Sequence, residues 1–351
     1  TIIMYEFRIW HAQVVGFGLL AMLSNIVERK AAMRGCQTVP LPGWIDRSLR
    51  IAFLGVLMGP ACVSLDLYTI GYPVLTACLC MYMIPYSNLV EQRGGFSWLF
   101  MRDSIFVRPL ISFIRGRIGL RLIKTVDLDP EQTYVVGIHP HSVLPIGAIT
   151  AVVDESVQDS WKNLFPGVNL RILAATFVFY IPLYREMMLG AGVCDAARYS
   201  AKRILKLGYS IALVPGGATE ALYSREDRDI VYITKRRGFV KLALEAGASL
   251  LPVYSFNECN VWSIAGLESP IADKFKKKFQ SIFGISLPLV TGVLRRTQVA
   301  VVVGSPIKCP QTDAPTPKMV EEYLLKYTHA LESLYNDNRA EYNVMEKPAL
   351  S

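Results

Sequence analysis

Two histidines close together are the first sign of chemistry in this sequence. The 351-residue chain has four histidines, and His139 and His141 lie two positions apart, directly after the apolar run 134–138. The unperturbed pKa of imidazole lies near neutrality, so histidine is the usual proton carrier in catalysis. Pro140 fixes its own φ and keeps His139 out of helical geometry, so the run should stop at a sharp corner. The pair, followed by Ser142, predicts an acid–base site at the end of a strand.

Two other interpretations of the histidine pair stay open. The histidines could be structural and hydrogen-bonded, or they could bind a metal ion. A metal site needs further ligands, and the sequence offers only His11, His329 and scattered cysteines for that role. We therefore expect no metal and no bound cofactor, and a soluble metal-dependent hydrolase is a disfavoured class.

A glycine pair follows another strand-like run. Gly216 and Gly217 come after the apolar residues 211–214, and Glu220 lies shortly beyond them. Adjacent glycines let backbone N–H groups approach a substrate closely, as the donors to an anion or oxyanion must. Glu220 could orient a histidine. An ordinary turn is an equally good interpretation, because Pro-Gly-Gly is common in turns.

Three consecutive cations form a further motif. Lys235, Arg236 and Arg237 precede Gly238 and an amphipathic stretch. Cations beside a helix N-terminus can form a phosphate site. A solvated run of charges on the protein surface would have the same sequence.

The elements that must position these motifs begin near residue 125. Short apolar runs alternate with helical patterns there, which predicts an α/β domain with a mostly parallel sheet flanked by helices on both faces. Ligands of such sheets sit at the carboxyl ends of the strands, where the motifs lie. We expect strands at 134–138, 171–177, 210–214, 249–256 and 299–303, and helices at 143–153, 196–207, 239–246 and 318–335.

The region before this domain has the composition of a membrane protein. The stretch 51–86 carries a single charge, Asp66, and is too long for one span of about 20 residues. Glycines and prolines interrupt it, which predicts a hairpin that spans the membrane or re-enters it. Basic residues on both flanks place both ends in the cytosol. A pair of buried helices in a soluble core is the alternative.

The whole chain is accordingly expected to have five parts. Arginines alternate with bulky apolar residues after the hairpin, which is typical of a segment at the lipid headgroups or of a solvated surface helix. The chain starts with Thr1, so an N-terminal piece could be missing. The expected parts are an N-terminal region at 1–46 that could be membrane-associated, a transmembrane or re-entrant hairpin at 47–90, a basic amphipathic interfacial segment at 91–124, an α/β domain at 125–338 and a C-terminal tail at 339–351.

Charge and cysteine usage narrow the partners and the compartment. The net charge of +8 fits anionic lipid or a phosphorylated cosubstrate better than nucleic acid, because the basic residues form no dense patch beside a nucleic-acid motif. The chain has seven cysteines, an odd number, and no CxxC motif. This pattern does not indicate a set of structural disulfides. Reduced thiols indicate that the catalytic part faces the cytosol.

The ordered set of motifs resembles the type-2 diacylglycerol acyltransferase family, which includes monoacylglycerol and wax-alcohol acyltransferases. Ser142 stands where animal and fungal members usually have Gly, and His139 stands where plant members usually have Glu. This intermediate pattern indicates an algal or protist source. The resemblance covers roughly 47–334 and includes the hairpin and the blocks 128–130, 137–141, 182–186, 214–217 with Glu220, 237–239, 251–256 and 303–307.

One departure concerns the partner of the catalytic histidine. Related glycerolipid acyltransferases pair a His with an Asp five residues on, but Leu144 and Ile146 occupy those positions here. Any carboxylate that orients His141 must therefore come from elsewhere, and Glu220 is the candidate.

The resemblance implies an acyl-CoA-dependent O-acyltransferase that converts diacylglycerol to triacylglycerol. Other acceptors, monoacylglycerol or a long-chain alcohol, stay open, as does a non-enzymatic hairpin protein of the endoplasmic reticulum or lipid droplets. We expect the protein to lie in the endoplasmic reticulum membrane with its catalytic domain facing the cytosol, and a lipid-droplet surface is a second possible location. The expected partners are membrane lipids, and a homo-oligomer is possible. The expected catalytic residues are His141, His139 and Glu220; the expected substrate-binding residues are Ser142, Arg185, Glu186, Gly216, Gly217, Lys235, Arg236 and Arg237.

Overall fold

The chain divides into two compact units, of which the larger holds a central sheet. The smaller comprises Thr1–Val90, Thr176–Glu186 and Ser281–Phe283, and the rest belongs to the larger. The expected hairpin lies almost wholly outside the described residues, and no helix among the described ones is long and apolar enough to cross a membrane. The computed structural model describes residues 81–82, 86, 89–94, 107–224, 229–262, 274, 277–278, 280, 294–342 and 349–350.

Seven strands form the sheet of the larger unit, in the order β1-β8-β7-β2-β5-β3-β4. Neighbours from β7 to β4 run parallel, β8 runs antiparallel to β7, and β1 runs parallel to β8. The predicted mostly parallel sheet is therefore confirmed. Its strands are β1 (Arg121–Lys124), β2 (Tyr134–His139), β3 (Leu170–Ala174), β4 (Val193–Asp195), β5 (Ser210–Leu213), β7 (Ser249–Phe256) and β8 (Ala300–Val303). A second, two-stranded sheet pairs β6 (Ile230–Val231) with β9 (Ala349–Leu350).

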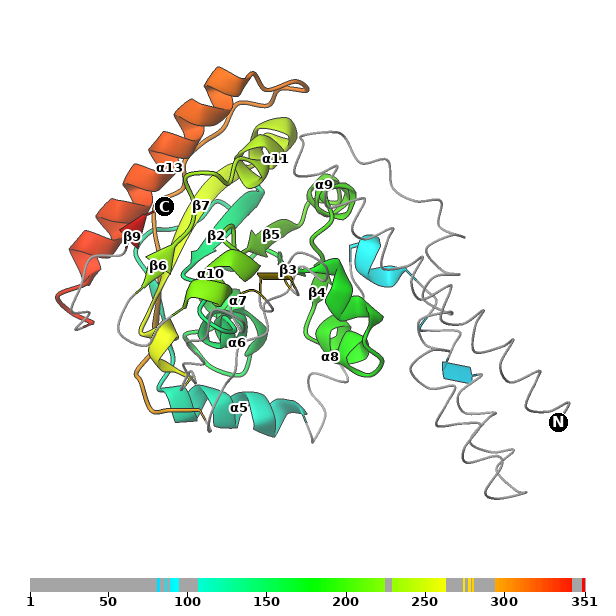
Figure 1. Ribbon diagram of the computed structural model, residues 1–351, viewed down its shortest axis with the longest axis vertical. Helices are drawn as coiled ribbons and strands as arrows, with labels where there is room; N and C mark the ends of the chain where they lie inside the picture. The colour runs from blue at the N-terminus through cyan, green and yellow to red at the C-terminus, as the bar shows by residue number, and fades with distance from the viewer. Residues whose placement is uncertain are drawn as a thin grey trace, which may run out of the picture. The chain divides into compact units, whose positions relative to one another are not determined.

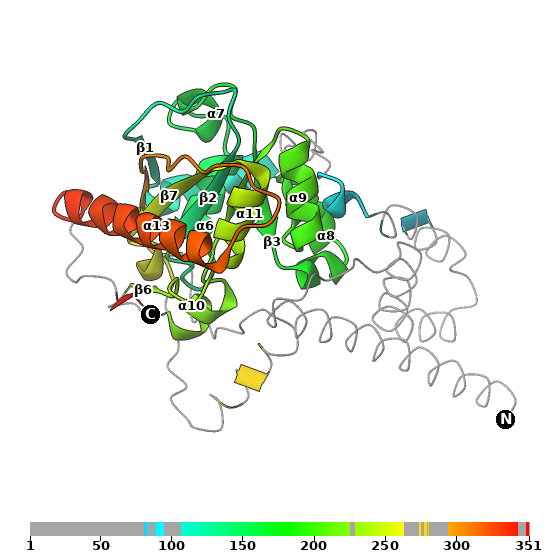
Figure 2. The same cartoon turned by 90° about the horizontal axis from the view of Figure 1, so that it is seen from above.

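Helices flank the sheet. The helices α9 (Arg198–Lys206), α11 (Gly238–Ala246) and α13 (Pro317–Asn338) share an apolar core with β2, β5, β7 and β8. Figure 1 shows α13 running beside β7, and Figure 2 shows it crossing in front of the strands. All residues of β2 and β7 are buried, which requires cover on both faces. The other helices are α5 (Val107–Ile118), α6 (Ile146–Val153), α7 (Trp161–Leu164), α8 (Tyr184–Gly190) and α10 (Ala218–Tyr223), with 3-10 helices η1 (Val90–Gln92), η2 (Thr176–Tyr180) and η3 (Glu258–Asn260).

The expected strands and helices of the α/β domain all occur, with shifted ends. The strand expected at 171–177 stops at Ala174, because the following residues form η2. Two strands of the seven-stranded sheet were missed: the three-residue β4, and β1, which lies just before the domain start expected at 125. The short strands β6 and β9 of the second sheet were not predicted either. The reversed direction of β8 was not anticipated either.

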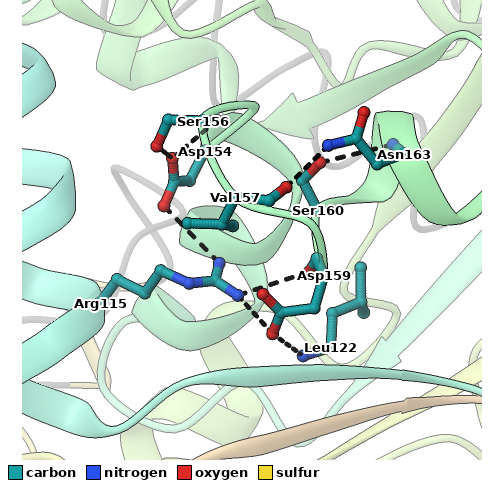
Figure 3. A network of polar contacts seen from close by, with 8 residues as sticks. All are labelled: Arg115, Leu122, Asp154, Ser156, Val157, Asp159, Ser160 and Asn163. Carbon is teal, nitrogen blue, oxygen red and sulfur yellow. Dashed lines mark hydrogen bonds and ion pairs between the residues drawn. The ribbon is translucent and has the colours of Figure 1, made fainter.

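A buried arginine ties α5 to the rest of the larger unit. Nη2 of Arg115 lies 2.6 Å from the Asp159 carboxylate, and Nη1 lies 3.7 Å from that of Asp154, which caps the C-terminus of α6. Asp159 also accepts the N–H of Leu122 in β1, at 3.3 Å (Figure 3). The helix is thereby fixed to both α6 and β1.

Candidate active site

The predicted histidine site lies at the carboxyl end of β2. This strand lies between β7 and β5, and His139 is its last residue. The His139–Pro140 peptide bond is cis, and Ser142 has a φ of +52°, so the chain turns sharply before α6 begins. Ser142 is 1% exposed, and its hydroxyl has no hydrogen-bond partner among the described residues. The motif therefore projects from the strand end, as the sequence predicted.

A buried carboxylate holds this turn in place. Glu220 is 1% exposed and lies in the first turn of α10. One of its oxygens accepts the main-chain N–H of His141 at 2.8 Å, and the other accepts the N–H of Tyr232 at 2.9 Å. Two separate loops are thus fastened to a single side chain.

The glycine pair makes room for this carboxylate. A Cβ atom at Gly216 would overlap the carboxyl group of Glu220, so a larger residue would displace it. Gly217 precedes α10 with a φ of +53°, a conformation that favours glycine. These geometric requirements explain both glycines, and their predicted substrate contacts stay a prediction.

The imidazole of His141 has the tautomer of a general base. Its Nδ1 lies 3.0 Å from the carbonyl oxygen of Ser142. A carbonyl can only accept a hydrogen bond, so we assign the proton to Nδ1, which leaves Nε2 with a free lone pair. Burial lowers the pKa of His141 below 6.5 and outweighs the Ser142 carbonyl and the Glu220 charge, which both act to raise it. His141 is therefore neutral, and able to accept a proton, at neutral pH.

The second histidine is wholly enclosed. His139 is 0% exposed; its Nδ1 lies 3.6 Å from Glu220, and its Nε2 lies 3.2 Å from the hydroxyl of Tyr327 in α13. Tyr327 also donates to the carbonyl of Gly137, at 3.0 Å. Sequence reasoning missed Tyr327, because it sits in the buried stripe of an amphipathic helix and looks like an ordinary core residue.

Glu220 was expected to orient the imidazole of His141. The structure places it at the main-chain N–H of that residue and beside the ring of His139. Its role in ring orientation stays a prediction, whereas its hold on the backbone is an observation.

The three cations have different surroundings. Arg236 donates to the carbonyl of Gly216 at 3.2 Å and to the hydroxyl of Thr219 at 2.7 Å, so it braces the glycine turn. Arg237 forms an ion pair with Glu321 at 2.7 Å. Lys235 is exposed. A role for these residues in binding phosphate stays a prediction.

Two further predicted residues belong to the smaller unit. Arg185 is 2% exposed, and its guanidinium lies 2.8 Å from the carboxylate of Glu186. Glu186 also accepts the hydroxyl of Tyr82 at 2.5 Å. This pair is an internal ion pair of that unit, and its predicted contact with substrate stays a prediction.

A second buried carboxyl group lies at the start of α6. Glu258 accepts the N–H of Gly147 at 2.8 Å and the hydroxyl of Ser255 at 2.5 Å. Burial is the main cause that raises its pKa from 4.5 to about 7. Nothing in its sequence context distinguished this residue. Within the described part of the chain, no three His, Cys, Asp or Glu residues are grouped so as to hold a metal ion.

The fold is a mostly parallel α/β sheet, and the histidine motif lies at the carboxyl end of its strand β2. The family model described as diacylglycerol acyltransferase matches residues 67–351, and the chain belongs to this family. It is therefore an acyltransferase, which excludes the alternative of a non-enzymatic hairpin protein. The search of the solved structures found no match.

Curated relatives cover most of the chain. It is 30% identical over 338 residues to "Diacylglycerol O-acyltransferase 2B" of Umbelopsis ramanniana. The alignment covers 90% of this chain and 93% of that protein. It is 34% identical to "Diacylglycerol O-acyltransferase 1" of Schizosaccharomyces pombe, over 78% of this chain and 84% of the relative. It is also 30% identical to "Acyl-CoA wax alcohol acyltransferase 1" of Homo sapiens, over 73% of this chain and 84% of that protein.

Proposed function

We propose that this enzyme transfers an acyl group from acyl-CoA to the free hydroxyl of diacylglycerol, forming triacylglycerol, with His141 as the general base. The observation that carries the proposal is the hydrogen bond from Nδ1 of His141 to the Ser142 carbonyl, which leaves Nε2 free to accept a proton. The lowered pKa of His141 and the relatives named diacylglycerol O-acyltransferases support it.

The reaction needs one proton to be moved twice. Nε2 of His141 takes the proton of the acceptor hydroxyl as the oxygen attacks the thioester carbonyl carbon. The tetrahedral intermediate collapses, the carbon–sulfur bond breaks, and the thiolate of CoA takes the proton back from Nε2. The products are the ester and CoA. Positioned proton transfer of this kind contributes about 10²–10⁴-fold to a rate.

The neighbours of His141 supply the remaining contacts. The Ser142 hydroxyl is buried without a partner among the described residues, which suits a donor to the substrate. Backbone N–H groups near Ser142 and at Gly216 and Gly217 are candidates for the oxyanion, where one donor is worth about 3 kcal/mol. Lys235, with Arg236 and Arg237 nearby in sequence, is the candidate for the phosphates of CoA.

The acceptor is tested with a panel of lipid alcohols. Membranes containing the enzyme are given labelled acyl-CoA with diacylglycerol, monoacylglycerol or a long-chain alcohol, and the esters are separated. We expect the highest kcat/KM for diacylglycerol. A higher value for the long-chain alcohol would assign the chain to wax synthesis, which the named wax alcohol relative makes the second candidate.

We further propose that the enzyme works at the cytosolic face of the endoplasmic reticulum and at lipid droplets, with α5 lying on the membrane surface. Two bulky apolar side chains of this helix face outward: Leu110 is 51% and Phe113 is 63% exposed, whereas Arg115 is only 8% exposed. Arg108 is also exposed and adds positive charge for anionic headgroups.

Paired variants test this orientation. L110S/F113S should raise the apparent KM for diacylglycerol presented in anionic vesicles and leave the KM for acyl-CoA unchanged. L207S is the matched control, because Leu207 is 55% exposed and follows the last residue of α9. Equal effects of the double variant and the control would contradict a docking role for α5.

A further inference from the structure

Tyr327 joins the last long helix to the strand that carries the histidines. Its ring is fully buried, packs edge-on against Phe239, and lies beside the imidazole of His139. Gly137 lies under the hydroxyl: a Cβ atom there would overlap the phenol oxygen. The contact between helix and strand therefore depends on one small residue and one tyrosine.

The hydrogen bonds around this hydroxyl fix the proton positions on His139. A phenol has one proton, and Tyr327 donates it to the carbonyl oxygen of Gly137. Burial raises the pKa of Tyr327 well above 10, so the phenol keeps this proton. The phenol oxygen can then only accept from His139, which assigns a proton to Nε2. The other nitrogen, Nδ1, lies 3.6 Å from the Glu220 carboxylate, which is a packing contact and not a hydrogen bond.

Two hydrogen bonds and one packing contact link Tyr327 to the backbone of the base. The path runs from the Tyr327 hydroxyl to His139 over 3.2 Å, from His139 to Glu220 over 3.6 Å, and from Glu220 to the main-chain N–H of His141 over 2.8 Å. Every side chain along it is buried: Tyr327 and His139 are 0% exposed, and Glu220 is 1% exposed. Tyr327 and His139 therefore contact other buried groups of the protein rather than its surface.

We propose that Tyr327 is a positioning residue for acyl transfer: through His139 and Glu220 it fixes the backbone that carries His141. This inference rests on the proposed role of His141 as the base. It also gives His139, which was expected among the catalytic residues, a positioning role. A side chain that acts only through others should change kcat and leave substrate binding unchanged.

The test is Y327F, which keeps the ring and removes only the oxygen. The Nε2–H of His139 then loses its acceptor inside the core, and kcat should fall about tenfold with an unchanged KM for acyl-CoA. Y323F is the matched control: Tyr323 lies one turn earlier on α13, and its hydroxyl has no hydrogen bond within the described part of the chain. Its kcat should equal that of the wild type.

A double-mutant cycle separates positioning from general stability. In an H139Q background, Y327F should cost little further activity, because the path is already broken. A full tenfold loss in that background would overturn the proposal, as would wild-type kcat in Y327F alone. If Y327F does not fold, the kinetics of H139Q alone test the proposal. A lowered kcat with unchanged KM supports a positioning role, and a raised KM with unchanged kcat overturns it.

H141A, assayed in parallel, keeps the two proposals apart. Activity retained in H141A would refute the base assignment, whatever Y327F does. Loss of activity in H141A together with wild-type activity in Y327F would refute only the positioning role of Tyr327.

Discussion

Replacing Glu220 by Gln removes one charge and one acceptor from the centre of the site while nearly conserving size. The carboxylate accepts the N–H groups of His141 and Tyr232 with separate oxygens. An amide has a single oxygen, so Gln can satisfy only one of them, and its NH₂ group must face the other. The E220Q variant therefore tests the acceptor and the charge rather than the packing.

The size of the effect follows from these contacts. A buried N–H left without an acceptor costs about 1–3 kcal/mol, so we expect the free energy of unfolding to fall by about 2 kcal/mol. If the same energy is lost from the transition state because His141 is no longer held, kcat falls about 30-fold.

The pH dependence gives a second, independent readout. The Glu220 charge is one of the causes that raise the pKa of His141, so its removal lowers that pKa further. A base works in its deprotonated form, and activity is lost as the pH falls through its pKa. The acid limb of kcat/KM should therefore move to lower pH in E220Q.

The assay follows labelled acyl-CoA into ester over a pH series in purified membranes, with the melting temperature measured in parallel. E245Q is the matched control, because Glu245 is 7% exposed and pairs with Arg198 and Lys202, on α9, away from the histidines. Unchanged kcat in E220Q, or an acid limb that moves to higher pH, would refute the reasoning.

Two further predictions concern a surface cation and a buried acid. K235A should raise the KM for acyl-CoA about fivefold, as expected from about 1 kcal/mol for an exposed ion pair, and the difference should shrink in high salt; an unchanged KM counts against a phosphate contact. The pKa of Glu258 is raised to about 7 in the fold, so its stabilising effect is full below pH 4.5 and is lost as the pH rises through about 7. E258Q stays neutral, so its melting temperature should fall less than that of the wild type between about pH 5 and 8.

The sequence predicted the parts of the fold that follow from local patterns. The five-residue apolar run before His139 and the Pro at its end were sufficient to predict a strand that stops at the histidine motif. β1 was missed because it is short and its two apolar residues lie between Arg121 and Lys124, within a basic segment that was interpreted as amphipathic. The direction of β8 was missed because apolar runs carry no information about the direction of a strand.

The structure brings His139, His141 and Glu220 together, but the contacts among them could not be predicted from the sequence. Glu220 could be named because it lies near a glycine pair, but its bond to the His141 backbone depends on how two loops meet. Tyr327 lies 188 residues from His139 and shows only the spacing of a core helix position. Long-range contacts of this kind leave no local signal in one sequence, and they decide which of the two histidines is enclosed.

The measurement that tests the central claim most directly is ester formation by H141A. The variant is compared with the wild type and with H329A, whose histidine is 77% exposed on α13, using labelled acyl-CoA and diacylglycerol in purified membranes. We predict that H141A loses about 10²–10⁴-fold in kcat while H329A retains wild-type activity. An H141A enzyme that forms triacylglycerol at the wild-type rate would contradict the assignment of His141 as the base.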